Sequence, residues 1–196
     1  MAGRPKEFER DAVLASARDV FWARGYDGAS LDDLTQAMRI GRASLYAEFG
    51  DKHSLFLEAL DRYRAERWAQ MSDVLEAATS VRAGIAALLR GTVNALWSDE
   101  GRRGCLLVNS IAELASSDPA VASRTAESFE RTAGLLRSAL ERGVRSGELE
   151  PSLDAEATAR YLANTLNGLR LLAKVGDRKI ADDVVEITLR TLESSS

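Results

Sequence analysis

Residues 29–52 read ASLDDLTQAMRIGRASLYAEFGDK, and this stretch decides the fold. Ser30 followed three positions later by Asp33 is a capping-box pattern, which predicts the start of a helix. The triplet Arg39-Ile40-Gly41 interrupts that helix after about two turns, and a second short helix is expected over 42–49. Asp51 is a favourable N-cap for a longer helix that follows. The stretch therefore predicts two short helices joined by a tight turn.

The sequence on either side of this stretch is also helical. Upstream, apolar residues recur at helical spacing from Phe8 until Gly25, which is expected to end the first helix, with a turn over 26–29. Downstream of the helix that starts near Asp51, further helices are expected over 81–97, 103–115, 118–145, 154–174 and 180–192. We therefore expect an all-α protein of about nine helices. A three-helix helix-turn-helix domain would occupy residues 1–52, and a C-terminal helical bundle domain residues 53–196.

The composition of the 196 residues argues against several classes of protein. Hydrophobic residues make up 45% and charged residues 29%, which is typical of a folded globular chain. No apolar run approaches the roughly 20 residues that span a bilayer, and the N-terminus lacks the apolar segment of a signal peptide. With one cysteine and one histidine, neither an internal disulfide nor a metal site is expected, and no cofactor is implied. We expect a cytoplasmic protein.

The second short helix has the geometry of a helix that reads DNA. The major groove, about 12 Å wide, admits one helix with small outward side chains. Here Leu45 and Phe49 point inward, and Arg42 can pair with a guanine or a phosphate. Ser30 would offer its hydroxyl and the free N–H groups of a helix start to another phosphate. The predicted DNA-contacting residues are Arg4, Lys6, Ser30, Arg39, Arg42, Ala43, Ser44, Tyr46, Lys52 and His53.

Two of these residues have an alternative interpretation, and the net charge is a mild argument against DNA. Tyr46 can pack beneath the helix instead of contacting a phosphate, and His53 can be a solvated residue at a helix start. The net charge of −4 disfavours a nucleic-acid partner on average. The placement of cations on one face matters more than that average.

The same residues resemble the helix-turn-helix signature of the TetR family of regulators. The matching pieces are the Phe21…Gly25-Tyr26 pair, Ser30 at the start of the second helix, and the Ser-Leu-Tyr…Phe…Lys series at 44, 45, 46, 49 and 52. The match is strong over roughly the first 60 residues, and the remainder is similar in the number and length of its helices. The resemblance implies a homodimer that binds an inverted-repeat operator and is released by a small-molecule effector.

Three residues depart from the family pattern. Arg39 stands where the family commonly has glycine, and a left-handed conformation there costs about 1 kcal/mol. Gly41 replaces the usual serine or threonine cap of the recognition helix, which removes one phosphate contact. Glu48 occupies a position that is often aromatic or histidine, and an acid there would repel phosphates. These departures bear on the operator sequence and not on the class of protein.

The long helices are expected to enclose an apolar effector pocket, although the same residues can equally form ordinary core. Cys105 has two interpretations, a reactive sensor thiolate and a buried structural residue. Its neighbouring arginines and a helix N-terminus favour the thiolate, and Gly-Cys-Leu-Leu at 104–107 resembles the electrophile-sensing, NemR-like branch of the family. A buried cysteine that acts as a small hydrophobe is the commoner case. The candidate ligand-binding residues are Trp68, Met71, Trp97, Cys105, Asn109, Thr125 and Phe129.

The last two long helices carry more apolar surface than one internal contact needs. Pairing across a two-fold axis into a four-helix bundle would bury this surplus, whereas the alternative is an internal helix pair in a monomer. The predicted dimer-interface residues are Leu162, Thr165, Leu166, Leu169, Leu172, Val184, Ile187 and Thr188.

Three functions are weighed at this stage. A ligand-responsive transcriptional repressor is favoured, with a thiol or electrophile sensor acting through Cys105 as its variant. The alternative is an adaptor protein that descends from a regulator and has weakened DNA binding. Gly41, Glu48 and the net charge are the features that leave this alternative open. An enzyme is not expected, because the sequence has no nucleophile–base order, no glycine-rich phosphate loop and no metal set.

Overall fold

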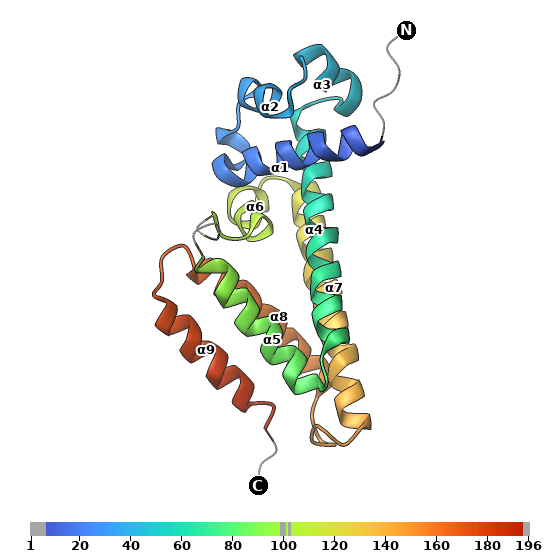
Figure 1. Cartoon of the computed structure of the whole chain (residues 1–196), viewed down its shortest axis with the longest axis vertical. Helices are drawn as coiled ribbons and strands as arrows, with labels where there is room; N and C mark the ends of the chain where they lie inside the picture. Colours follow the sequence, from blue (N-terminus) through green and yellow to red (C-terminus); the bar gives the residue numbers. More distant parts are fainter. Residues whose placement is uncertain (1–6, 99–100, 102, 194–196) are drawn as a thin grey trace.

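A computed structural model describes residues 7–98, 101 and 103–193, with side chains from residue 10 onward. In this part of the chain every regular element is a helix, which confirms the predicted all-α class (Figure 1). The helices are α1 (Glu7–Gly28), α2 (Leu31–Met38), α3 (Arg42–Phe49), α4 (Lys52–Ala77), α5 (Val81–Leu96), α6 (Leu106–Leu114), α7 (Pro119–Arg145), α8 (Ala155–Leu172) and α9 (Arg178–Arg190). Arg4 and Lys6, which are predicted to contact DNA, lie outside the described residues.

Helices α1, α2 and α3 form a small head at one end of the molecule (Figure 1). Their apolar faces meet around Phe21, Leu34 and Leu45, each of which is at most 1% exposed. The predicted capping box is present, because the Ser30 hydroxyl accepts from the Asp33 N–H and the Asp33 carboxylate accepts from the Ser30 N–H. Arg39 adopts the predicted left-handed conformation with φ of 53°, and this places α3 directly after the turn.

The end of the first helix differs from the prediction. Gly25 has φ of 74° and does break the helix, but helical structure resumes over 26–28 where a turn was expected. A Cβ at Gly25 would lie 2.8 Å from Oε2 of Glu113 in α6, so this position needs glycine both for its backbone conformation and for space. The resumed turn is therefore stabilised by a contact from a distant helix that local sequence does not reveal.

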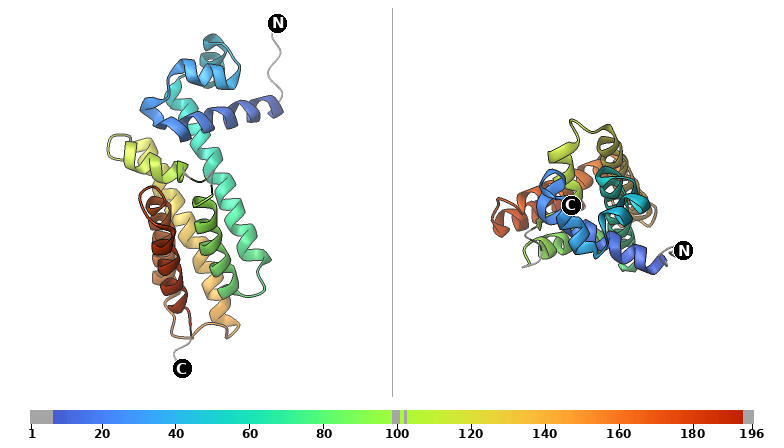
Figure 2. Two further views of the ribbon diagram at one scale, coloured as in Figure 1. Left: turned by 60° about the vertical axis from the view of Figure 1, so that its left-hand side comes forward. Right: turned by 90° about the horizontal axis from the view of Figure 1, so that it is seen from above.

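The remaining helices form the bundle below the head, with α9 at its outer edge (Figures 1 and 2). The bundle has its own core, which includes Leu89, Leu136, Leu162 and Leu166. The observed helices are shorter than the expected ones at several ends. In particular α6 begins at Leu106 and not near residue 103, because Gly104 has φ of 71° and Cys105 takes the extended N-cap conformation.

The long helix α4 connects the head to the bundle. It begins at Lys52, the last residue of the predicted first domain, and its buried residues as far as Tyr63 pack into the core of the head. Cys105, Leu106 and Val108 near the start of α6 belong to that same core. The head is therefore packed against both α4 and α6, and a movement of either helix reaches it directly.

Asp118 caps α7 and also links it to the start of α4. Its carboxylate accepts from the N–H groups of Ala120 and Val121, and its Oδ2 lies 2.6 Å from Nε2 of His53. Burial raises the pKa of Asp118, but the hydrogen bonds from His53 and from the two backbone N–H groups outweigh it and lower the pKa overall. A lowered pKa means that this carboxylate contributes stability above the ordinary value of about 3.9 and loses it as the pH falls through the folded-state value.

Asp118→Ala is therefore expected to lower the free energy of unfolding by about 0.5–2 kcal/mol at neutral pH, as for other N-cap deletions. The difference from the parent should begin to shrink as the pH falls below the ordinary carboxyl value of about 3.9, and it should be lost as the pH falls through the lowered folded-state pKa of Asp118. Chemical denaturation across this pH range measures both effects. Asp118→Asn is the control, since asparagine keeps a capping oxygen without the charge. If Asp118→Ala lowers the free energy of unfolding equally at acidic and neutral pH, the stabilising role assigned to the Asp118 carboxylate is contradicted.

In the described part of the chain, no helix is both long and apolar enough to cross a membrane. The same residues contain no group of three or more histidine, cysteine or carboxylate side chains that could hold a metal ion.

Candidate nucleic-acid interface and a cavity in the bundle

Helix α3 presents an almost unbroken exposed face on the outside of the head. Arg42, Ala43, Ser44 and Tyr46 are exposed, with Tyr46 47% exposed, whereas Leu45 and Phe49 are buried beneath them. Gly41 caps the helix without a side-chain hydrogen bond, so its end is open. The outward side chains are small or polar, which is what entry into a major groove requires.

Arg42 is held by an acid in the helix before it. One of its guanidinium nitrogens lies 2.6 Å from Oδ1 of Asp32 in α2, and this hydrogen bond and charge raise the pKa of Arg42. Both side chains are well exposed, so the ion pair is screened by water and weak. A base or a phosphate can therefore replace Asp32 as the partner of Arg42.

Two other predicted phosphate contacts are engaged within the protein. The Ser30 hydroxyl and the Ser30 N–H both donate to the Asp33 carboxylate. Neither group is therefore free to donate to a phosphate, which was the predicted role of Ser30. The hydrogen bonds from Ser30 lower the pKa of Asp33, which also pairs with Arg24 at 2.7 Å. The Lys52 ammonium lies 4.5 Å from the centre of the Tyr26 ring and remains partly exposed.

His53 faces the bundle and not the DNA-reading face. Its ring is bound to Asp118 at the start of α7, so this residue links α4 to α7, and its predicted DNA contact is not supported. The sequence could not reveal this, because the partner is 65 positions away.

The acid at position 48 is paired with a residue that could not be predicted from the sequence. Arg10 in α1 donates to Glu48 at 2.8 Å and to Glu58 at 2.6 Å, and its guanidinium also lies over the Phe49 ring. The charge that was expected to repel phosphates is therefore partly compensated within the head, because one guanidinium is shared by two carboxylates. Basic residues on α1 offered no signal for this, because their partners depend on how α1 crosses α3 and α4.

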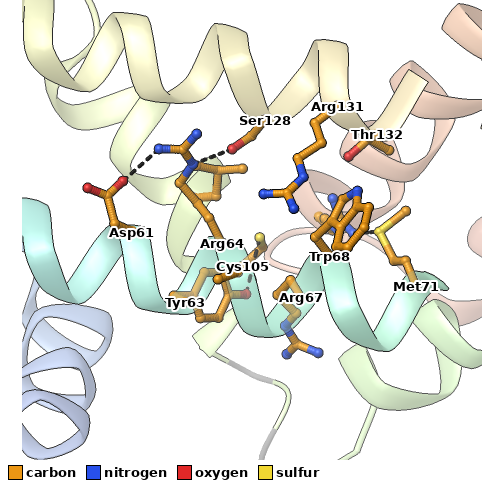
Figure 3. Close-up of a pocket in the computed structure, with 13 residues that line it drawn as sticks. Asp61, Tyr63, Arg64, Arg67, Trp68, Met71, Cys105, Ser128, Arg131 and Thr132 are labelled. Carbon is orange, nitrogen blue, oxygen red and sulfur yellow. Dashed lines mark hydrogen bonds and ion pairs between the residues drawn. The ribbon is translucent and has the colours of Figure 1, made fainter. Parts of the chain in front are cut away.

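A cavity lies in the upper bundle between α4, the start of α6, α7 and α8, with a volume of about 190 Å³ (Figure 3). Of the predicted ligand-binding residues, Trp68, Met71 and Cys105 line it. Thr125 and Phe129 line an adjoining hollow of about 360 Å³ between α6, α7 and α8. These five predicted residues are brought together around one region of the bundle.

Trp97 and Asn109 are placed elsewhere. Trp97 packs against the bundle core, and Asn109 borders a separate surface hollow, where its amide donates to the Arg103 carbonyl. Trp97 was predicted from helical spacing alone, which does not say toward which neighbour a side chain points.

Cys105 is 5% exposed and belongs to the core of the head as well as to the cavity wall. The Tyr63 hydroxyl donates to its sulfur at 3.4 Å. Burial raises the pKa of Tyr63, so the phenol stays protonated and remains a donor. The environment is that of a small buried residue with one weak hydrogen bond, which is the common structural role of cysteine.

Helices α8 and α9 expose an apolar face that includes Val184 and Ile187 of the predicted interface but otherwise differs from it. Leu162, Leu166, Leu169 and Thr188 are at most 1% exposed inside the protomer, so these four side chains are not available to a second chain. Thr188 is bonded to the Tyr161 hydroxyl at 3.1 Å, and Thr165 and Leu172 are half-buried. The exposed apolar residues of these helices are Tyr161, Leu171, Ile180, Val184 and Ile187.

A contact between α6 and α1 links the cavity region to the head. The Glu113 carboxylate accepts from the N–H groups of Tyr26 and Asp27 at 3.0 and 2.9 Å, directly after the Gly25 break. Leu107, six residues earlier on α6, lines both hollows. A displacement of α6 would therefore also displace the end of α1.

Comparisons with known proteins agree with this architecture. Residues 13–59 match the family model of bacterial regulatory proteins of the tetR family, and residues 81–188 match that of the tetracyclin repressor-like C-terminal domain. The chain is 36% identical to the HTH-type transcriptional regulator YezE of Bacillus subtilis over 97% of this chain and all of YezE. It is 31% identical to the HTH-type transcriptional repressor ComR of Escherichia coli, over 89% of this chain and 83% of ComR.

A solved structure gives the most informative match. It is a cysteine mutant of CifR, a TetR family transcriptional regulator, in complex with 26-bp double-strand operator DNA. The chain is 42% identical to it, with a TM-score of 0.82, over 97% of this chain and all of that one.

Proposed function

This chain belongs to the TetR family of transcriptional regulators, and from that premise we propose that it is a ligand-responsive repressor that binds operator DNA as a homodimer. The observation that carries the proposal is the exposed face of α3, where small and polar side chains stand over buried Leu45 and Phe49. The operator-bound CifR structure, which is similar over almost the whole chain, supports DNA as the partner. The repressor ComR supports the direction of regulation.

In this proposal α3 enters the major groove. Arg42 reads a base or holds a phosphate, Ala43 and Ser44 contact base edges or the backbone, and Tyr46 donates to a phosphate. Arg39 and Lys52 flank the helix and contact the backbone, and the N-terminal arm with Arg4 and Lys6 adds further cations. A protein with this task acts in the bacterial cytoplasm, and its role is binding rather than catalysis.

The homodimer is proposed through the exposed apolar face of α8 and α9. This face includes Ile187 at 57% exposure and Leu171 at 54%. Large apolar side chains grouped on adjacent helices are typical of an interface. A two-fold axis there would set two heads side by side on an inverted repeat.

Effector binding in the cavity is proposed to release the operator by moving α4 and α6. Both helices line the cavity and both pack against the head. The Glu113 contact with α1 and the His53–Asp118 contact between α4 and α7 are the links that would transmit the movement.

The test is a gel-shift assay with the DNA upstream of the protein's own gene. We expect a sequence-dependent complex whose affinity falls steeply with salt concentration, because Arg and Lys contacts to phosphates release counterions. Equal affinity for this DNA and for an unrelated duplex would contradict the proposal and would favour an adaptor.

A second prediction concerns the ion pair between Arg42 and Asp32. Asp32→Asn removes the competing charge, so Arg42 no longer has to leave an acid in order to bind DNA. We expect operator affinity to rise by a few-fold at low salt, with the gain shrinking as salt screens both charges. Fluorescence anisotropy measures it. Asp27→Asn, which removes an equal charge from the far end of α1, is the matched control; an equal gain for both variants would show a general charge effect instead.

A further inference from the structure

We propose that the cavity between α4, α7 and α8 takes a small organic acid, with its carboxylate held by Arg131 and Arg170 and its apolar part in the adjoining hollow beside Phe129. The inference rests on the proposed function in one respect, namely that this cavity is the effector site. It adds the chemical class of the effector, which follows from the charges and donors on the cavity wall.

The cavity wall is strongly positive. Arg64, Arg67, Arg131 and Arg170 line it, against a single carboxylate, Asp61. That carboxylate is already compensated, because it accepts from Arg64 at 2.6 Å and from Arg124 at 3.0 Å. This concentration of positive charge stands in a chain whose net charge is −4.

Three of the four arginines have no acid partner among the described residues. Arg67 donates to the amide oxygen of Gln70 at 2.9 Å, and Arg170 donates to that of Asn167 at 3.1 Å. Arg131 lies over the Trp68 ring, with its guanidinium carbon 3.9 Å from the ring centre. Most other arginines of the described chain are paired with carboxylates, for example Arg10, Arg18, Arg62 and Arg137. Three arginines without an acid partner thus border one cavity; Arg67 and Arg131 are also exposed to solvent, whereas Arg170 is half-buried.

Figure 3 shows how these groups lie. Arg64 is turned toward Asp61 and Ser128, whereas Arg131 reaches from α7 across the space toward Trp68 on α4. The indole N–H of Trp68 is buried and has no hydrogen-bond partner in the described structure. The cavity therefore offers guanidinium groups and an unused N–H donor, with the hydroxyls of Ser128 and Thr132 as uncharged polar groups. A ligand rich in acceptors and negative charge complements this donor-rich wall.

The adjoining hollow has a different character. Its wall is mainly apolar, and Arg170 is its only charged residue. Arg170, Leu107, Ser128 and Thr132 border both spaces, so Arg170 lies where the positive cavity meets the apolar hollow. A planar guanidinium at that place can bind a carboxylate through two parallel hydrogen bonds while the rest of the molecule extends beside Phe129. This arrangement favours an amphipathic carboxylate over a neutral or cationic compound.

The experiment compares acids with their neutral isosteres by isothermal titration of the purified protein without DNA. The probes are octanoate and phenylacetate, paired with octanamide and phenylacetamide. The amide can form only neutral-acceptor hydrogen bonds to the arginines, whereas the carboxylate forms charged ones. We therefore expect each acid to bind at least about tenfold more tightly than its amide. Arg131→Gln and Arg170→Gln should each lower affinity for the acid by at least about tenfold. Arg160→Gln, an exposed arginine of α8 outside the cavity, should bind as the parent does.

Amides that bind as well as the acids would overturn the proposal, and so would the absence of acid binding at millimolar concentration. Acid binding that is unchanged in both cavity variants would overturn it as well. Circular dichroism melting shows whether the variants are folded. The gel shift of the protein without any ligand tests DNA binding separately, so a failure of this inference is distinguishable from a failure of the proposed function.

Discussion

Arg42→Ala is expected to weaken operator binding strongly. The guanidinium is the only long cationic side chain that α3 presents on its exposed face, and it can form a bidentate pair with a guanine or a phosphate. Each half-site of a dimer loses one such contact, so we expect at least a tenfold loss of affinity and a shallower dependence on salt. Fluorescence anisotropy with labelled operator at several salt concentrations measures both.

The fold should not suffer, because Arg42 is 59% exposed and its ion pair with Asp32 is weak. Arg145→Ala, which removes a similarly exposed cation from the distant end of α7, is the matched control. Tyr46→Phe removes only a hydroxyl and is expected to cause a smaller loss. Parent-like affinity for Arg42→Ala would show that α3 does not read DNA.

Ile187→Arg is expected to convert the dimer into a monomer. The side chain is 57% exposed in the protomer, so the substitution leaves the bundle core intact, but a charge would be buried at the proposed α8–α9 interface. Once the two heads are no longer linked, each half-site is bound separately. The loss of avidity should weaken operator binding by about 10²–10⁴-fold.

Sedimentation velocity gives the oligomeric state, and the gel shift gives the affinity. Ala69→Arg places the same charge on an exposed position of α4 and is expected to leave the dimer unchanged. A dimeric Ile187→Arg protein would place the interface elsewhere, whereas a parent protein that is monomeric at micromolar concentration would reject the dimer altogether.

The features that could be predicted from the sequence are local ones. The capping box at Ser30 and the cap at Asp51 are each determined by a few neighbouring residues, and both are present in the structure. The left-handed Arg39, which is also present, was expected from the resemblance to the family. The inward placement of Leu45 and Phe49 likewise follows from the helical period. The reading head could therefore be recognised before any tertiary contact was known.

The features that could not be predicted depend on which neighbour a helix face meets. Leu162, Leu166 and Leu169 of α8 face the core of their own protomer and not a second chain. Leu171 of the same helix and Ile187 of α9 are just as apolar but are exposed. Periodicity identifies an apolar stripe, but it does not divide that stripe between an internal contact and an interface.

The ion pairs of the head and the cations of the cavity were missed for a related reason. Arg10 and Glu48 are 38 positions apart, and Arg131 and Arg170 meet at one cavity only because α7 and α8 are packed together. A sequence search for a ligand pocket favours apolar residues, so it found Trp68, Met71 and Phe129 but not the arginines beside them.

The most direct test of the central claim is selection of DNA duplexes from a random pool by the purified protein, followed by footprinting of the enriched sequence. The account predicts enrichment of an inverted repeat whose half-site centres lie about one helical turn, or a multiple of it, apart on one face of the duplex. It also predicts that Arg42→Ala protein does not enrich that repeat. Enrichment of no sequence, or of a single asymmetric site protected by a monomer, would contradict the account.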